Sequence, residues 1–327
     1  MKTRLIPFAL LFASALAVAN AQVEESMPTQ VLVNVESAGP LDVSALTVEV
    51  NGQKEPLKSW TPVLPANAQV ALLIDQGLRS SVGSELNTLR DFVREMTPGV
   101  EVMVGYMQYG YVDVAQDFTD DHQKAASSLH LPVAQPGMSA SPYMCLSDYV
   151  KKWPGSGAAS TTGEMRRAER MASSASHKAR FVLMISSGVD PYNGSTSPMN
   201  QGSPYVDAAI VDAQRAGVAV YSIYFGGAGL PGVSANSSGQ DYLNQITQAT
   251  GGVNYWQGLG DPVSITPFLR RFREAITHSY IASFDAPGSR DHAHELVAVK
   301  FSVVKTKGKS GKTSLHAAEK VHPGNVE

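Results

Sequence analysis

A doubly wound α/β fold with a mostly parallel sheet is predicted by two features of this 327-residue sequence. The first is a set of strand-like runs that are apolar without interruption, which is typical of strands covered on both faces. The second is the regular alternation of these runs with helix-like segments. The four apolar runs are residues 70–74, 100–107, 181–185 and 218–225.

The first 21 residues have the pattern of a secretory signal peptide. Lys2 and Arg4 precede an apolar run over residues 5–18, and Ala19-Asn20-Ala21 gives a small-x-small cleavage pattern. The run is shorter than the ~20 residues that a membrane-spanning helix needs. We therefore expect cleavage near Ala21 and a periplasmic or secreted protein without a membrane span.

Charge and cysteine content narrow the class of protein further. The net charge is -3, and no long basic patch precedes the last segment, so nucleic acid is not expected as a partner. Cys145 is the only cysteine, so no internal disulfide can form. It lies between Met144 and Leu146, which favours a small buried hydrophobe over a nucleophile.

Four segments are expected along the chain. They are a signal peptide (1–21), an N-terminal β segment and linker (22–67), the α/β domain (68–283), and a C-terminal β segment with a mobile tail (284–327). The N-terminal β segment rests on β-branched runs at 31–35 and 46–50 and on the tight-turn pair Asn51-Gly52. The linker, over residues 60–68, contains two prolines. We expect the terminal β segments to pair with each other beside the domain.

Within the domain, helical spacing of apolar residues and terminal signals predict the helices. Tyr109-Gly110 predicts a hairpin turn into an edge strand. Ser203-Pro204 is an N-cap followed by proline at the first helical position. The predicted helices cover residues 81–96, 120–129, 143–153, 164–175, 205–216 and 241–250 and a longer stretch from Thr266. Later strands are predicted at 253–256, 280–284 and 296–304.

Three stretches resemble the von Willebrand factor A domain. They are the strand that ends in Ile74-Asp75, the helix over 205–217 with the strand over 218–224, and the helix, Thr-Gly-Gly turn and short strand over 242–255. The resemblance covers about residues 68–283. The flanking β segments are similar to those of exported bacterial proteins related to this domain, many of them acidobacterial.

The resemblance implies a metal-ion-dependent adhesion site on three loops. In the family, Asp-x-Ser-x-Ser, a threonine and a further aspartate hold Mg²⁺ or Ca²⁺, and a partner carboxylate completes the coordination. Here Asp75 matches the first ligand, but Gly77 and Arg79 replace the two serines. Glycine has no side-chain oxygen, and a guanidinium cannot ligate a cation.

The second and third loops also depart from the family pattern. The second loop has no clear threonine, and Ser139 and Ser141 are the nearby candidates. In the third loop Ser187 takes the place of the aspartate, and Asp190 follows three residues later. Hard cations need several oxygen ligands, so we expect no metal cofactor, although Mg²⁺ or Ca²⁺ stays an alternative.

Asp75 therefore has two interpretations. It is either a residual metal ligand, or a structural residue that pairs with Arg79 or accepts hydrogen bonds from the helix start at residues 80–81. The sequence favours the structural interpretation because only one family ligand is retained.

Other motifs give weaker evidence for a functional site. Residues 227–232 match G-x-G-x-x-G, but Pro231 intervenes and residues 233–236 have a loop-like composition, so a surface loop is favoured over a dinucleotide site. His292 and His294 share one face of a strand but lack a further ligand in sequence reach. No motif of a metalloprotease or serine hydrolase is present, and we expect no enzyme.

The favoured function is an exported, non-catalytic binding module. It would engage a protein or a cell-surface partner through the loops at the carboxyl ends of the strands, where ligands bind in open α/β sheets. The residues expected to contribute are Asp75, Arg79, Ser139, Ser141, Ser187, Asp190 and Tyr192. The alternatives are a structural or assembly protein that docks through its terminal β segments, and a hydrolase with Asp75 or Asp190 as base.

Overall fold

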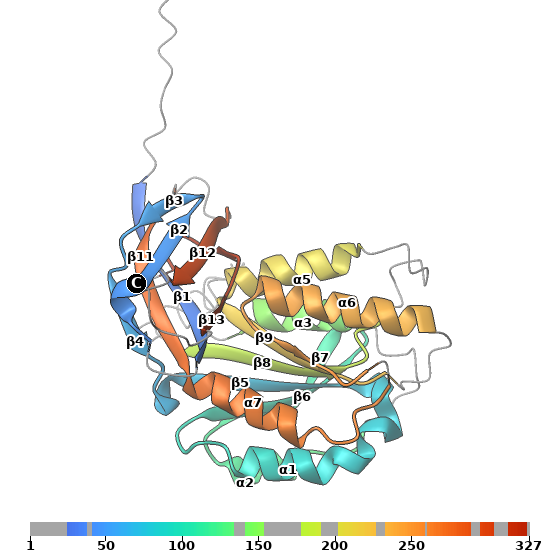
Figure 1. The fold of residues 1–327 in the computed structure, drawn as a ribbon. Helices are drawn as coiled ribbons and strands as arrows, with labels where there is room; N and C mark the ends of the chain where they lie inside the picture. Colours follow the sequence, from blue (N-terminus) through green and yellow to red (C-terminus); the bar gives the residue numbers. More distant parts are fainter. Residues whose placement is uncertain are drawn as a thin grey trace, which may run out of the picture.

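The computed structural model shows an α/β sheet with an all-β unit at one end (Figure 1). It describes residues 25–37, 41–133, 141–153, 178–190, 202–226, 233–258, 260–288, 295–303 and 313–325. The expected signal peptide, the predicted helix at 164–175 and the pair His292 and His294 lie outside these residues. The predicted α/β class, with a parallel-rich sheet and flanking antiparallel sheets, is confirmed.

The central sheet has six strands, and every neighbouring pair is parallel except β6 and β7 at one edge. The four uninterrupted apolar runs are neighbours in this sheet, as expected. In spatial order the strands are β10 (Asn254–Tyr255), β9 (Val218–Tyr224), β8 (Ala179–Ser186), β5 (Ala68–Asp75), β6 (Glu101–Gln108) and β7 (Tyr111–Thr119).

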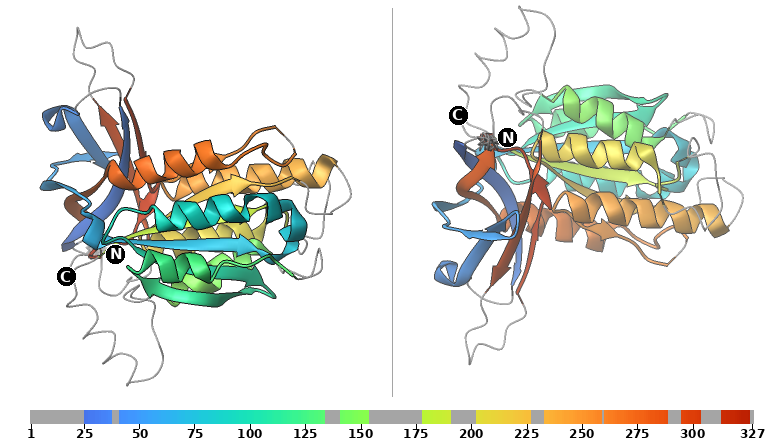
Figure 2. Two further views of the ribbon diagram at one scale, coloured as in Figure 1. Left: turned by 90° about the horizontal axis from the view of Figure 1, so that it is seen from below. Right: turned by 90° about the horizontal axis from the view of Figure 1, so that it is seen from above.

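Helices cover both faces of the central sheet (Figure 2), which is why its inner strands carry apolar side chains on both faces. In β5, Leu72 and Ile74 enter one buried cluster, and Ala71 and Leu73 enter the other. The first face carries α1 (Leu86–Arg94), α2 (His122–Ser127) and α7 (Thr266–Thr277). The second carries α3 (Pro142–Lys151), α5 (Pro204–Arg215) and α6 (Val233–Ala249).

The β unit consists of two four-stranded antiparallel sheets that pack against each other around a small apolar core. Phe284 and Phe301 meet in this core, with ring centroids 6.2 Å apart. One sheet has the order β13 (Thr313–Ala317), β1 (Glu25–Ser37), β11 (Ser279–Gly288), β4 (Ser59–Pro62). The other has the order β14 (Lys320–Val321), β12 (Val297–Val303), β2 (Leu46–Val50), β3 (Gln53–Glu55). Strands from the two ends of the chain thus pair with each other, as predicted.

Three predictions about the β unit need correction. The linker at 60–68 is wrong, because its first residues belong to β4, and Trp60 stacks on Tyr280 of β11 with ring centroids 4.9 Å apart. The mobile tail is wrong in part, because β13 pairs with β1. The domain boundary expected at residue 283 falls inside β11, which pairs with β1 from Glu25 onward.

Two helix starts also differ from prediction. The helix expected over 81–96 begins only at Leu86, because the 3₁₀ helix η3 (Gln76–Glu85) precedes it. This stretch contains Gly77 and Gly83, and glycine disfavours the α-helix. Residues 233–236 are not a loop, because α6 begins at Val233. The G-x-G-x-x-G stretch before it lies outside the described residues. The short helices η1 (Val43–Ala45) and η2 (Pro65–Asn67) connect strands.

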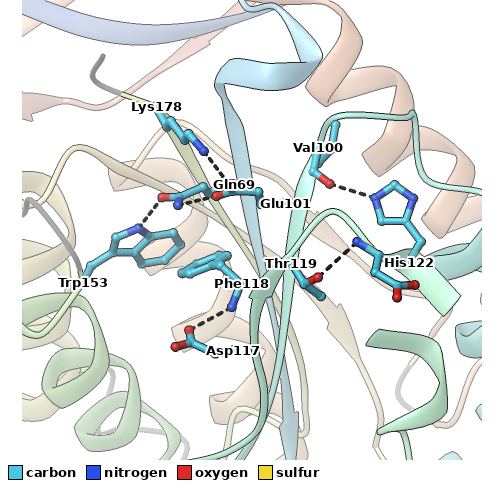
Figure 3. A network of polar contacts seen from close by, with 10 residues as sticks. Gln69, Val100, Glu101, Asp117, Phe118, Thr119, His122, Trp153 and Lys178 are labelled. Carbon is cyan, nitrogen blue, oxygen red and sulfur yellow. Dashed lines mark hydrogen bonds and ion pairs between the residues drawn. The ribbon is translucent and has the colours of Figure 1, made fainter. Parts of the chain in front are cut away.

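The amino ends of the parallel strands face the β unit, and their carboxyl ends point away from it (Figure 2). At the amino ends, a polar cluster joins β5, β6, the residue before β8 and the segment after α3 (Figure 3). Glu101 Oε1 lies 2.5 Å from Lys178 Nζ, and Gln69 donates to Glu101 Oε2 at 2.8 Å. Trp153, just after α3, donates to Gln69 Oε1 at 2.9 Å. The opposite end of the sheet is therefore left for the candidate site.

Candidate functional site

Asp75 is the last residue of β5 and is buried. Its Oδ1 accepts a hydrogen bond from the backbone N–H of Gly77 at 2.8 Å, and its Oδ2 accepts one from Ser186 Oγ at 2.8 Å. Ser186 is the last residue of the neighbouring strand β8. Asp75 therefore links the carboxyl ends of two parallel strands and caps the first turn of η3. The side chains of Arg79 and of residues 80–81 lie outside the described residues.

Two side chains form hydrogen bonds with the backbone of the turn after β8. Ser186 Oγ accepts from the backbone N–H of Gly188 at 2.9 Å, and Tyr143 of α3 donates to the carbonyl oxygen of Gly188 at 2.8 Å. Gly188 has a φ of 66°, and a Cβ there would lie 2.3 Å from the carbonyl oxygen of Gly239 in α6. Only glycine fits this close approach of backbone to helix.

Asp190 is buried and hydrogen-bonded at the start of α5. Ser203 Oγ donates to Asp190 Oδ2 at 2.6 Å and also accepts from the backbone N–H of Tyr205 at 3.2 Å. The helix N-terminus carries a partial positive charge, so the carboxylate of Asp190 is favoured there. Asp190 therefore stabilises the start of α5 through Ser203.

Tyr143 is buried where the charges of both carboxylates act on it. Its burial raises the pKa of the phenol well above the ordinary value, and the nearby charges of Asp190 and Asp75 raise it further, as does Tyr242. The ring of Tyr242 meets that of Tyr143 edge-on, with centroids 6.0 Å apart. The raised pKa keeps Tyr143 neutral at pH 7, so its hydroxyl acts as a hydrogen-bond donor.

Ser141, the residue before α3, differs from the other serines at this end of the sheet. Its side chain is fully buried, yet its Oγ has no hydrogen-bond partner in the part of the chain that the structure describes. It occupies the N-cap position of α3 without making a side-chain cap bond. A buried polar group without a partner costs roughly 1–3 kcal/mol. The hydroxyl of Ser141 therefore does not stabilise the folded protein.

The structure thus describes four of the seven predicted site residues with their side chains. Asp75, Ser141, Ser187 and Asp190 are all buried at or just beyond the carboxyl ends of the strands. Ser139 and Tyr192 lie outside the described residues, and Arg79 is described only by its backbone in η3.

Sequence reasoning missed three residues of the hydrogen-bonded site. Ser186 precedes the position compared with the family aspartate, and Ser203 was interpreted only as a helix cap. Tyr143 lies on a helix and carries no motif. A polar residue at the end of an otherwise apolar strand was the available signal for Ser186.

These residues do not fit a divalent cation of the adhesion-site type. The oxygens of Asp75 already accept from Gly77 and Ser186, and Oδ2 of Asp190 accepts from Ser203. Among the described residues, no group of three or more His, Cys, Asp or Glu side chains could hold a metal ion.

Comparison with known proteins gives no family assignment. No protein-family model and no curated protein matches the sequence. Within the described residues, no helix has the length and hydropathy to cross a membrane.

Solved structures with a partly similar chain path include three from different organisms. Proximal thread matrix protein 1 of the mussel byssus is 14% identical, with a TM-score of 0.39, and the match covers 67% of this chain and 48% of that one. The ArnB paralog VWA2 of Sulfolobus acidocaldarius is 9% identical, with a TM-score of 0.39 and coverage of 92% and 79%. Manganese-loaded TRAP protein of Plasmodium vivax is 10% identical, with a TM-score of 0.39 and coverage of 82% and 100%. The chain spans about half the length of the mussel protein. At these scores the similarities carry no function to this chain.

Proposed function

We propose that this chain is an exported, non-catalytic binding module of the von Willebrand factor A type, with a doubly wound sheet. It engages a protein or a cell-surface partner through the loops at the carboxyl ends of the strands. The observation that carries the proposal is the hydrogen-bonded set of Asp75, Ser186, Tyr143, Asp190 and Ser203. These side chains fix three loops at one end of the sheet, as a rigid binding surface requires.

The chemistry of this set favours binding over catalysis. Each serine hydroxyl donates to a carboxylate, and activation of a serine nucleophile requires a general base that a third group orients. Tyr143 is held neutral and donates to a backbone carbonyl, which is a positioning role. The proposal therefore assigns these residues to the support of the loops.

The proposed binding is independent of divalent metal. We expect calorimetric titration with Mg²⁺, Mn²⁺ and Ca²⁺ to give no binding tighter than ~100 μM. The reason is that both oxygens of Asp75 and one of Asp190 already accept protein hydrogen bonds. Tighter binding that is lost in Asp75→Ala would overturn this part of the proposal.

Site-specific photo-crosslinking tests the location of the partner. Val133 is 82% exposed, and its backbone N–H donates to the side chain of Gln76, next to Asp75. Lys54 is exposed on β3 in the β unit and serves as the control position. A photo-reactive phenylalanine analogue at each position, in the native host, should capture a distinct partner at 133 and none at 54.

The captured partner is then purified and its affinity measured. Ser186→Ala removes one donor to Asp75 and is expected to weaken binding about 10-fold, while an alanine at Lys54 leaves it unchanged. Capture of a partner only at position 54 would overturn the proposal and favour docking through the β unit. Turnover of an ester, glycoside or peptide, abolished by Asp75→Asn, would favour the hydrolase instead.

A further inference from the structure

The turn between β6 and β7 holds a tyrosine in a backbone conformation that tyrosine rarely adopts. Tyr109 and Gly110 have φ angles of 50° and 83°, and Asn51 and Gly52, between β2 and β3, have 48° and 81°. The two hairpins therefore share one turn geometry. Asn-Gly is a preferred pair for such a turn, whereas the Cβ of a residue with positive φ crowds the following carbonyl. Tyr109 therefore carries steric strain that an asparagine would relieve.

Burial does not account for the tyrosine at this position. Tyr109 is 55% exposed and Tyr111 is 44% exposed, and their rings stack with centroids 6.5 Å apart and an angle of 29° between their planes. We call these two residues the tyrosine pair. Exposed tyrosines that pre-form a contact surface are favoured at protein interfaces, because they supply a large contact area with few rotatable bonds.

The tyrosine pair lies at the same end of the sheet as the candidate site. Met107 is opposite Asp75 in the register of β5 and β6, so the turn begins two residues beyond the level of Asp75. The helix α3 packs against both strands of this hairpin. Neither tyrosine belongs to the set that the proposed function uses, so the tyrosine pair is an additional surface.

The strand that follows the tyrosine pair is acidic. Residues 101–121 contain five acidic side chains and no lysine or arginine. Lys178 neutralises Glu101 at the far end of β6, and the other four are exposed: Asp113, Asp117, Asp120 and Asp121. Asp113 follows Tyr111 by two residues in β7, so the two side chains leave the same face of the strand.

We propose that the tyrosine pair and Asp113 form a docking surface for a protein segment that carries arginine or lysine side chains. A cationic side chain lies over a tyrosine ring and is attracted by its negative face. The carboxylate of Asp113 supplies the complementary charge beside the ring, and the rest of β7 attracts the same segment during encounter. This proposal rests on the proposed function in one respect, namely that a partner binds at this end of the sheet.

Tyrosine-ring NMR tests the proposal with two defined probes, a tetra-arginine and a tetra-glutamate peptide. The NMR sample is the chain from residue 22 onward, labelled with ring-¹³C tyrosine. The signals of Tyr109 and Tyr111 are assigned from the Tyr109→Phe and Tyr111→Phe variants. Tetra-arginine should shift both ring signals, and tetra-glutamate should shift neither. Tyr109→Asn should weaken binding of tetra-arginine at least 5-fold while raising the unfolding midpoint.

Matched charge variants separate the surface from a general charge effect. Asp113→Asn should weaken binding of tetra-arginine at least 3-fold, whereas Asp207→Asn, the same change at an exposed position on α5, should leave it unchanged. Equal weakening by both variants would overturn the proposal, as would unchanged affinity or a lowered midpoint in Tyr109→Asn. If tetra-arginine binds as expected but no partner is captured at residue 133, the result counts against the proposed function and leaves the docking surface supported.

Discussion

Ser141 and Ser203 occupy equivalent positions, each directly before the proline that starts a helix, and yet they have different environments. Ser203 caps α5 and donates to Asp190, so its hydroxyl has partners on both sides. The hydroxyl of Ser141 is buried and has no partner in the described part of the chain. The same dipeptide thus stabilises one helix and leaves a polar group unsatisfied at the other.

Alanine substitution at the two serines should therefore have opposite effects. Ser203→Ala removes the cap of α5 and a hydrogen bond to a buried carboxylate, and we expect a loss of about 2–3 kcal/mol in the free energy of unfolding. Ser141→Ala removes only an unsatisfied group and should be neutral or stabilising by up to ~1 kcal/mol. Urea unfolding at pH 7 measures both. A loss of more than 1 kcal/mol in Ser141→Ala would mean that its hydroxyl has a partner in the folded protein.

At the scale of the element, the two hairpins with equal turn geometry allow an exchange experiment. Tyr109→Asn should raise the free energy of unfolding by about 1 kcal/mol, and Asn51→Tyr should lower it by a similar amount, because only asparagine tolerates positive φ well. Thermal unfolding of both variants checks the pair. A destabilised Tyr109→Asn would show that the stacked rings outweigh the strain of the turn.

The polar cluster at the amino ends of the strands predicts a pH dependence. Burial alone would raise the pKa of Glu101, but hydrogen bonds from Lys178 and Gln69 and the charge of Lys178 outweigh burial and lower it from its ordinary value of 4.5. A lowered folded pKa gives stability that is complete above the ordinary value and disappears as the pH falls through the folded value.

The variant Glu101→Gln should therefore be less stable than the wild-type protein at pH 7, by about 1–2 kcal/mol. At pH 3 the difference should shrink, because this pH lies below the ordinary pKa of 4.5 and the carboxyl group of the unfolded chain is then protonated, which favours unfolding. Urea unfolding at both pH values measures the difference. The variant Glu49→Gln, on β2, provides a control with the same chemical change. An equal difference at both pH values would contradict the assignment.

At the scale of the whole molecule, the last described residues join the β unit to the α/β sheet. Glu319 donates its backbone N–H to the carbonyl of Ala249 at the end of α6, at 3.0 Å. The side chain of Asn325 pairs with the backbone of Gln30 in β1, accepting at 2.6 Å and donating at 2.8 Å. A Cβ on Gly251, whose φ is 82°, would lie 2.6 Å from the carbonyl carbon of Ala317. The two units therefore contact each other closely.

Removal of residues 313–327 should destabilise both units. The truncation deletes β13 and β14 and exposes an edge of β1 and of β12. We expect faster amide exchange in β1 and also at the end of α6, where the carbonyl of Ala249 loses the N–H of Glu319 and keeps only the side chain of Gln214. Hydrogen exchange read by mass spectrometry checks both segments. Exchange that increases in β1 alone would show that α6 does not depend on the β unit.

Much of the fold could be predicted because its signals are local. The inner strands are apolar on both faces along most of their length, and the hairpin turns at 51–52 and 109–110 each contain a glycine, which tolerates a tight reversal. Elements whose structure depends on a partner were missed. The strand β4 contains Pro62, and β13 follows a lysine-rich stretch, and both exist because β11 and β1 supply the backbone partners. Strand propensity depends strongly on such context.

For the site, the sequence by itself determined the position of Asp75 at the end of a buried strand and the absence of a carboxylate at positions 77 and 187. These follow from residue identity alone. Only the tertiary structure decided which groups contact the buried carboxylates. The donors to Asp75 and Asp190 include Ser186 and Ser203, and Ser186 is 111 residues from Asp75 in the chain. Such contacts arise because parallel strands bring distant residues to one edge of a sheet, and no local pattern records that neighbourhood.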